Sequence, residues 1–177
     1  LVKEFMKVLP FDLTKAQLNV LSQIRKDLES EFPMNRLLQG DVGSGKTIVA
    51  LLAMLIAVDN GYQAALMAPT EILADQHFIA MRRLLEPSRF RVERLTGATS
   101  SRVRRTLYSG LADGGINLVV GTHALVQEPL VFHELGLVII DEQHRFGVLQ
   151  RAGLRAKGLH PDVLVMTATP IPRTLAL

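Results

Sequence analysis

The eight residues from Gly40 to Thr47 read GDVGSGKT and fit the pattern GxxxxGK(S/T), which binds phosphate in nucleotide-binding proteins. A short β-like run, Arg36–Gln39, precedes them, and an apolar helical pattern begins at Lys46. Glycine lets the backbone turn its N–H groups toward an anion, and the first turn of the next helix adds unpaired N–H donors. A glycine-rich turn that only caps a helix is the alternative, but a chance match in such a chain is on the order of one in a hundred. The stretch therefore predicts a strand, a phosphate-binding loop and a helix.

Two side chains of this loop have a chemical task of their own. Lys46 is expected to place its charge against the β- and γ-phosphates, and the Thr47 hydroxyl is expected to bind Mg²⁺. The predicted cofactors are therefore ATP and Mg²⁺. The residues expected to surround the phosphates with the backbone of the loop are Gly40, Asp41, Val42, Gly43, Ser44 and Gly45.

The remainder of the 177-residue chain alternates short β-rich runs with longer helical patterns. This order is typical of an α/β fold, in which a mostly parallel sheet has helices on both faces. The other predicted strands are Ala64–Met67, Arg91–Leu95, Asn117–Val120, Leu137–Ile140 and Val163–Met166, and the predicted helices are Thr14–Ser30, Lys46–Asn60, Glu71–Leu85 and Ser101–Ala112.

The composition of the chain excludes some kinds of site and of protein. The chain has no cysteine, which excludes disulfides and cysteine-ligated zinc, and its net charge of +3 permits contact with phosphates without requiring it. The longest apolar run, Ile48–Val58, is too short to span a membrane and predicts a buried helix instead. We therefore expect one domain, no membrane partner and a cytoplasmic location. Both ends of the sequence suggest that residues 1–177 come from a longer protein.

Asp141 and Glu142 follow the apolar run Leu137–Ile140 directly. Because the carboxyl ends of parallel strands meet at one edge of a sheet, both carboxylates should lie near the phosphate-binding loop. Asp141 is then suited to hold Mg²⁺, and Glu142 to orient or deprotonate the water that attacks the γ-phosphate. Lys46, Asp141 and Glu142 are the predicted catalytic residues. An ordinary helix N-terminus is the alternative for an Asp-Glu pair considered without that loop.

Asp141-Glu142-Gln143-His144 resembles the second motif of superfamily 2 helicases. Within that superfamily, the chain most resembles the RecG-type DNA translocases, and the similar segments extend from Leu9 to Leu177. Transcription-repair coupling factors are similar in the last two segments, but Gln143 and Ser44 favour the RecG type. The segments that carry the resemblance are GDVGSGKT, APTEILADQH (68–77), GTHALVQ (121–127), DEQHRFGV (141–148) and TATPIPRTLAL (167–177).

The resemblance implies a RecA-like P-loop fold and a role for several further residues. Gln17 is expected to contact adenine and Phe11 to pack on the base, although Gln17 could be an ordinary surface residue and Phe11 a core residue. The residues implied in coupling ATP hydrolysis to movement are Gln143, His144, Thr167 and Thr169. The residues implied in contacting nucleic acid are Pro69, Thr70, Thr96, Gly97, Arg102, Arg105, Thr122 and His123. Capping of helices by the threonines and a solvated arginine face remain the alternatives.

The resemblance also implies partners that this chain does not supply. Residues 1–177 correspond to the first RecA-like, ATP-binding domain of an enzyme that acts on branched or double-stranded DNA. A second RecA-like domain with an arginine finger and an N-terminal wedge domain would complete it, so we expect these residues alone to bind ATP but hydrolyse it poorly. A non-catalytic nucleotide switch and a P-loop enzyme for small molecules are the rival hypotheses.

Overall fold

The computed structural model describes residues 2–7, 9–86, 88–127, 129–142 and 148–168. The described chain forms a six-stranded sheet in which every strand pairing is parallel. Each strand predicted from the sequence is confirmed, with ends that differ by two residues at most. The strands are β1 (Asn35–Gln39), β2 (Gln63–Met67), β3 (Val92–Leu95), β4 (Leu118–Gly121), β5 (Leu135–Asp141) and β6 (Asp162–Thr167).

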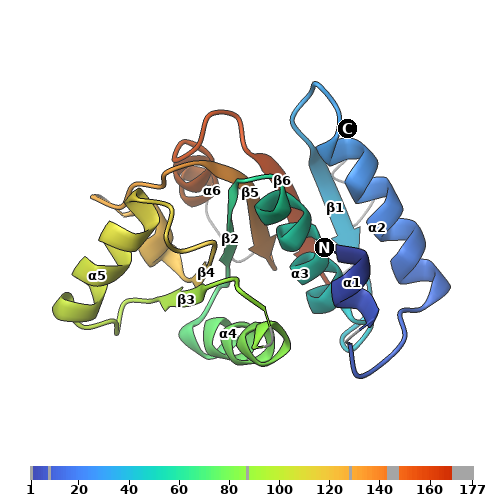
Figure 1. Ribbon diagram of the computed structural model, residues 1–177. Coiled ribbons are helices and arrows are strands. Elements are labelled where there is room, and N and C mark those ends of the chain that lie inside the picture. Colours follow the sequence, from blue (N-terminus) through green and yellow to red (C-terminus); the bar gives the residue numbers. More distant parts are fainter. Residues whose placement is uncertain (1, 8, 87, 128, 143–147, 169–177) are drawn as a thin grey trace.

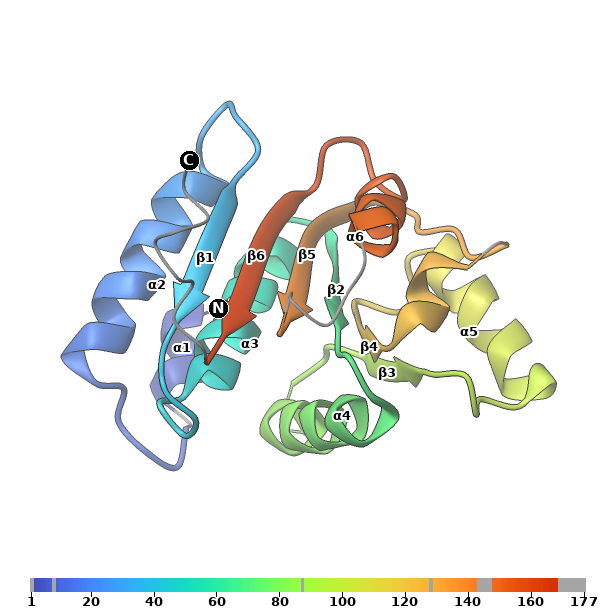
Figure 2. The same ribbon diagram turned by 180° about the vertical axis from the view of Figure 1, so that it is seen from behind.

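The strand order β1-β6-β5-β2-β4-β3 brings the two nucleotide motifs close together (Figures 1 and 2). Gln39, the last residue before the glycine-rich loop, is paired with Thr167 of β6. Asp141 is paired with Met166 of the same strand. The loop and Asp141 therefore leave the same edge of the sheet from strands separated only by β6, roughly 10 Å apart.

Helices cover both faces of the sheet, as the sequence predicted. The predicted helices are confirmed, whereas α1, the 3₁₀ helix η1 and α6 were not predicted because each is too short to show a clear helical period. In Figure 1, α2 lies along edge strand β1 and α5 lies toward the opposite edge, which β3 forms. The helices are α1 (Val2–Lys7), α2 (Lys15–Leu28), α3 (Lys46–Asp59), α4 (Glu71–Leu85), α5 (Ser101–Ala112), η1 (His123–Val126) and α6 (Val148–Arg155).

Alternate residues of the central strands enter two different hydrophobic cores. In β5, Leu137 and Ile139 pack against the core formed with α1 to α4. Val138 and Ile140 face the opposite core, which includes residues of α5 and α6. Strands buried on both faces are apolar throughout, which explains why β5 has no polar alternation.

The glycine-rich loop is anchored by a helix with no exposed side. Every residue of α3 from Ile48 to Leu55 is buried, as expected of a helix that is apolar all round. None of the described helices is long and apolar enough to cross a membrane. The N-terminus of α3 is therefore held in place by the core of the domain.

Asp162 fixes the start of β6 against β1. Its carboxylate accepts a hydrogen bond from the main-chain N–H of Met34, and Val163 N–H donates to the Met34 carbonyl. Burial raises the pKa of Asp162 above its ordinary value of 3.8, and the bond from Met34 opposes this rise. The contact aligns the two strands whose far ends carry the glycine-rich loop and Thr167.

Candidate nucleotide-binding site

The glycine-rich loop has the backbone conformation that an anion site requires. Gly43 and Gly45 have φ of +81° and +82°, in the left-handed region that glycine adopts at little cost. Gly45 caps α3 without a side-chain hydrogen bond, so the first N–H groups of the helix have no capping side chain. These donors and the positive end of the helix dipole point to the space where a phosphate would bind.

The Lys46 side chain folds back over this loop. Its Nζ donates to the carbonyl oxygens of Gly40 at 2.6 Å and of Asp41 at 2.8 Å. The ammonium is thus placed above the loop by backbone acceptors, and one of its three donors is free of these two bonds. This is the position from which a lysine can meet the phosphate oxygens of a nucleotide on the loop.

Gln17 contacts the loop directly, which the sequence alone did not show. Its Nε2 donates to the Ser44 carbonyl at 3.0 Å, while its Oε1 accepts from the main-chain N–H of Thr14. One N–H and one lone pair of the amide remain after these bonds, which matches the one donor and one acceptor needed by the N7 and N6 edge of adenine. Phe11 is 47% exposed, which excludes the core alternative for it and leaves its ring open to a base.

Asp141 lies at the end of β5 and is 8% exposed. Its Oδ2 is 2.7 Å from Nε2 of His77, a residue of α4. This partner was missed by the sequence interpretation. His77 ends the APTEILADQH segment, but nothing in its spacing relates it to a residue 64 positions away.

Glu142 joins the nucleotide motif to the segment after β6. Its Oε1 accepts from the Ala168 N–H at 3.1 Å, and the Thr167 hydroxyl donates to its Oε2 at 3.5 Å. The backbone of Glu142 has a φ of +51°, which is uncommon for a residue with a side chain and is found at functional sites. The main-chain N–H of Gly40 also donates to the Thr167 carbonyl at 3.2 Å. Thr167 therefore touches both the glycine-rich loop and Glu142.

The donor atoms at this edge fit Mg²⁺. Thr47 and Asp141 offer a hydroxyl and a carboxylate, and hard oxygen ligands are those that Mg²⁺ prefers. Across the residues described, no group of three or more His, Cys, Asp or Glu side chains forms a metal cage. Mg²⁺ in nucleotide sites is commonly held by one or two protein ligands together with water and substrate phosphates.

Gly45→Ala is expected to abolish nucleotide binding while leaving the sheet folded. A Cβ at this position would lie 2.2 Å from Nε2 of Gln17, on a backbone with φ of +82°, so both the helix cap and the Gln17 contact would have to shift. The matched control is Gly61→Ala, where φ is +91° but no atom lies within 4 Å of the added Cβ. Titration with a fluorescent ATP analogue should show loss of binding for the first variant and near-normal affinity for the second. Equal effects of the two variants would contradict this assignment.

The residues predicted to contact nucleic acid differ in how far their side chains are exposed to solvent. Thr96 is 1% exposed and Thr122 is 3% exposed, so neither side chain is open to solvent, and their contact with nucleic acid stays a prediction. The Thr70 hydroxyl accepts from the Leu73 N–H, which confirms the capping alternative. Thr70 is nevertheless exposed at the same edge as the glycine-rich loop. Pro69 is half-buried, and the other exposed members of the set are Gly97, Arg102, Arg105 and His123.

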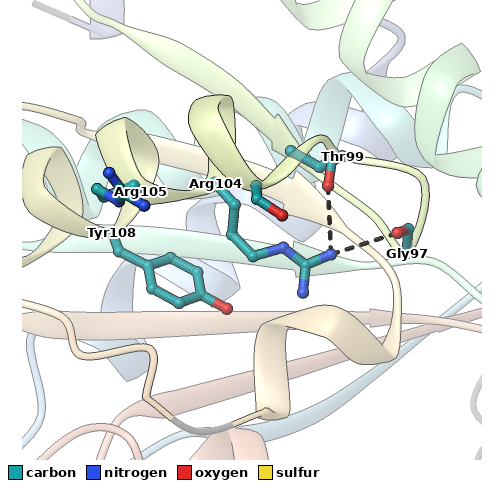
Figure 3. A pocket seen from close by; sticks show the side chains of 6 residues that line it. Gly97, Thr99, Arg104, Arg105 and Tyr108 are labelled. Carbon is teal, nitrogen blue, oxygen red and sulfur yellow. Dashed lines mark hydrogen bonds between the residues drawn. The ribbon is translucent and has the colours of Figure 1, made fainter.

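The loop after β3 is held in shape by Arg104 (Figure 3). Its Nη2 donates to the carbonyl oxygens of Thr96, Gly97 and Thr99. The residues that line the neighbouring pocket of about 480 Å³ are Gly97, Thr99, Ser101, Arg104, Arg105 and Tyr108. Arg104 is thus a structural residue of this loop, and Arg105, whose side chain is exposed, lines the same pocket. Tyr108 was not predicted.

Three of the predicted coupling residues, Gln143, His144 and Thr169, lie outside the described residues. Their proposed roles rest on the sequence alone. Of the coupling set, the structure describes Thr167, whose contacts with Gly40 and Glu142 are given above.

Known proteins with similar sequences belong to the family that the motifs predicted. The chain is 57% identical over 177 residues to the ATP-dependent DNA helicase RecG of Synechocystis, covering all of this chain and 21% of the relative. It is 57% identical over 173 residues to the protein of the same name from Bacillus subtilis, covering 98% of this chain and 25% of the relative. The predicted resemblance to RecG-type helicases is confirmed. The chain spans about a quarter of the length of these relatives.

Solved structures show the same fold. A structure of RecG bound to a three-way DNA junction superposes with a TM-score of 0.86 at 52% identity, covering 98% of this chain and 23% of that one. The DEAD-box helicase Mss116 bound to single-stranded RNA superposes with a TM-score of 0.77 at 18% identity, over 99% of this chain and 39% of that one, which supports the fold alone. The predicted RecA-like fold is confirmed. Because the family model for DEAD/DEAH box helicases matches residues 14–177, this chain belongs to the DEAD/DEAH box helicase family.

Proposed function

We propose that residues 1–177 are the first RecA-like, ATP-binding domain of an ATP-dependent DNA translocase of the RecG type. The observation that carries this proposal is the meeting of Lys46, Asp141 and Glu142 at one edge of the sheet, in a chain 57% identical to RecG helicases throughout. In this proposal the whole enzyme acts on branched DNA in recombination and repair, in the cytoplasm, where bacterial DNA is found.

The nucleotide is ATP, held by the glycine-rich loop and recognised by Gln17 and Phe11. Lys46 contacts the β- and γ-phosphates, and Thr47 and Asp141 hold Mg²⁺, which neutralises charge on the phosphates. Glu142 accepts a proton from the attacking water or orients it. Support comes from the bonds between Gln17 and the loop, from the position of Lys46 and from the oxygen donors at the edge.

DNA lies across the same edge in this proposal. Thr70 follows β2, whereas Gly97 and the pocket beside Arg105 follow β3, and backbone N–H groups and arginines suit phosphate oxygens without reading bases. The RecG neighbour bound to a three-way junction supports branched DNA as the substrate. Double-stranded DNA would be engaged by the same backbone contacts.

Besides Lys46, hydrolysis of this kind uses an arginine finger at the γ-phosphate, which the arginines of α5 are too distant to supply. The arginines of α5 lie toward the β3 edge, whereas the glycine-rich loop follows β1 at the other edge, roughly 24 Å away across the sheet. An arginine finger contributes on the order of 10³-fold or more to this kind of reaction. We propose that a second RecA-like domain supplies it and that an N-terminal wedge domain engages the junction.

The test compares ATP turnover by this chain and by the longer protein at one stated salt concentration. Each is assayed alone and with forked, four-way and linear duplex DNA of equal length. We expect this chain to bind ATP and to remain far below the typical enzyme rate of about 10 s⁻¹, and the longer protein to be stimulated most by the branched substrates. A DNA-stimulated rate near 10 s⁻¹ from this chain, or equal stimulation of the longer protein by linear duplex, would contradict the proposal.

A further inference from the structure

The side chain that contacts the proposed metal ligand Asp141 comes from a part of the chain with no assigned role in ATP binding. His77 lies in the middle of α4, and its Nε2 is 2.7 Å from Oδ2 of Asp141. Their side chains are 12% and 11% exposed. Little water therefore competes for this contact, and its geometry is set by packing between α4 and the end of β5.

The contact determines how the carboxylate is presented. An ionised carboxylate has only acceptors, so His77 must donate its Nε2 proton to Asp141. This bond restricts the rotation of the carboxyl group and uses one acceptor site of Oδ2, so that Oδ1 is held in a defined direction for another ligand. Partners of this kind orient metal-binding groups, and their removal typically lowers metal affinity 10- to 100-fold.

We propose that His77 is a positioning residue for the Mg²⁺ site, holding Asp141 in the orientation that receives the ion. This inference rests on the proposed function, because it requires Asp141 to bind Mg²⁺ with ATP. His77 itself touches neither the nucleotide nor the metal in this proposal.

The helix that carries His77 is also anchored at the proposed DNA side. The Glu71 carboxylate, in the first turn of α4, accepts from the Ala98 N–H at 3.0 Å in the loop after β3. Asp75 is paired with Arg94 of β3. Glu71 and His77 are six residues apart, about 9 Å along the helix axis. One rigid element therefore joins the loop beside the pocket of Figure 3 to the carboxylate of the metal site.

The experiment separates metal affinity from nucleotide affinity. Binding of a fluorescent ATP analogue to this chain is measured in excess EDTA and over a Mg²⁺ titration. The variants are His77→Leu, which removes the donor, and His77→Gln, which keeps an N–H donor at similar reach. His77→Met replaces the leucine variant if circular dichroism shows that the latter is not folded. His133→Leu removes an exposed imidazole elsewhere and serves as the control.

We expect His77→Leu to need about tenfold more Mg²⁺ for half-maximal enhancement of binding, with unchanged affinity in EDTA. His77→Gln should lie within threefold of the unsubstituted chain, and His133→Leu should match it. An unchanged Mg²⁺ requirement in the leucine or methionine variant overturns the inference, as does a glutamine variant no better than leucine or an equal loss of affinity in EDTA. If the unsubstituted chain binds no ATP analogue at any Mg²⁺ concentration, the proposed function fails instead.

Discussion

Lys46→Ala is expected to weaken ATP binding to this chain on the order of 100-fold, about 2.7 kcal/mol, and to abolish turnover in the longer protein. The ammonium is held above the glycine-rich loop by the carbonyl oxygens of Gly40 and Asp41. Opposite charges about 4 Å apart near a protein surface attract by about 4 kcal/mol, and part of this is lost to desolvation. The affinity is measured by titration with a fluorescent ATP analogue at constant Mg²⁺.

The control for this prediction is Lys26→Ala. Lys26 is an exposed lysine in the last turn of α2, so its substitution removes the same charge from the chain without touching the loop. Its affinity for ATP should stay within twofold of the unsubstituted chain. Unchanged nucleotide affinity and turnover in Lys46→Ala would remove the basis of the ATP-binding proposal.

Glu142→Gln is expected to lower the hydrolysis rate of the longer protein by 10²- to 10⁴-fold, the range that a general base contributes, with ATP affinity almost unchanged. The structure indicates that this substitution changes the chemistry of residue 142 more than its contacts. The oxygen of a glutamine amide can still accept the hydrogen bond from Ala168 N–H that Glu142 Oε1 now accepts, so the position of the Thr167–Ala168 segment is preserved. The longer contact of 3.5 Å, in which Oε2 accepts from the Thr167 hydroxyl, changes because an amide NH₂ group donates, and the ability to take a proton from water is lost. Single-turnover hydrolysis with radiolabelled ATP measures the chemical step, and filter retention of bound ATP measures trapping.

The comparison variant is Glu142→Ala, which removes both the proton acceptor and the contact with Ala168. We expect it to lose hydrolysis as completely as glutamine and, in addition, to weaken the coupling of DNA binding to ATP binding. Should Glu142→Gln leave hydrolysis nearly unchanged, this carboxylate would not be the base, and the rival hypothesis of a nucleotide switch would gain support.

Local sequence pattern predicted the elements of the fold well, for a physical reason. The strands are buried on both faces, so their apolar runs are uninterrupted, and the turns between them contain glycine, proline or threonine. The long helices have enough turns for their period to be visible, whereas α1 and α6 do not. The sequence also placed Asp141 and Glu142 at the edge that carries the glycine-rich loop, because carboxyl ends of parallel strands share one edge.

The site was predicted less completely, because several of its contacts join residues that no spacing rule connects. Gln17 reaches Ser44 because α2 packs beside α3. Thr96 and Thr122 follow strands as expected, yet both side chains are buried. A residue's position directly after a strand in the sequence predicts the edge of the sheet at which it lies. It does not predict whether its side chain faces solvent.

What the sequence by itself determined is therefore the class of fold, the phosphate-binding loop and the two carboxylates, since each depends on residues adjacent in the chain. The pairing of His77 with Asp141 and the contacts of Glu142 with Thr167 and Ala168 were decided only by the tertiary structure. Those contacts depend on the strand order, because β5 lies between β6 and β2. The helix after β2 therefore reaches Asp141, and the end of β6 reaches the adjacent Glu142.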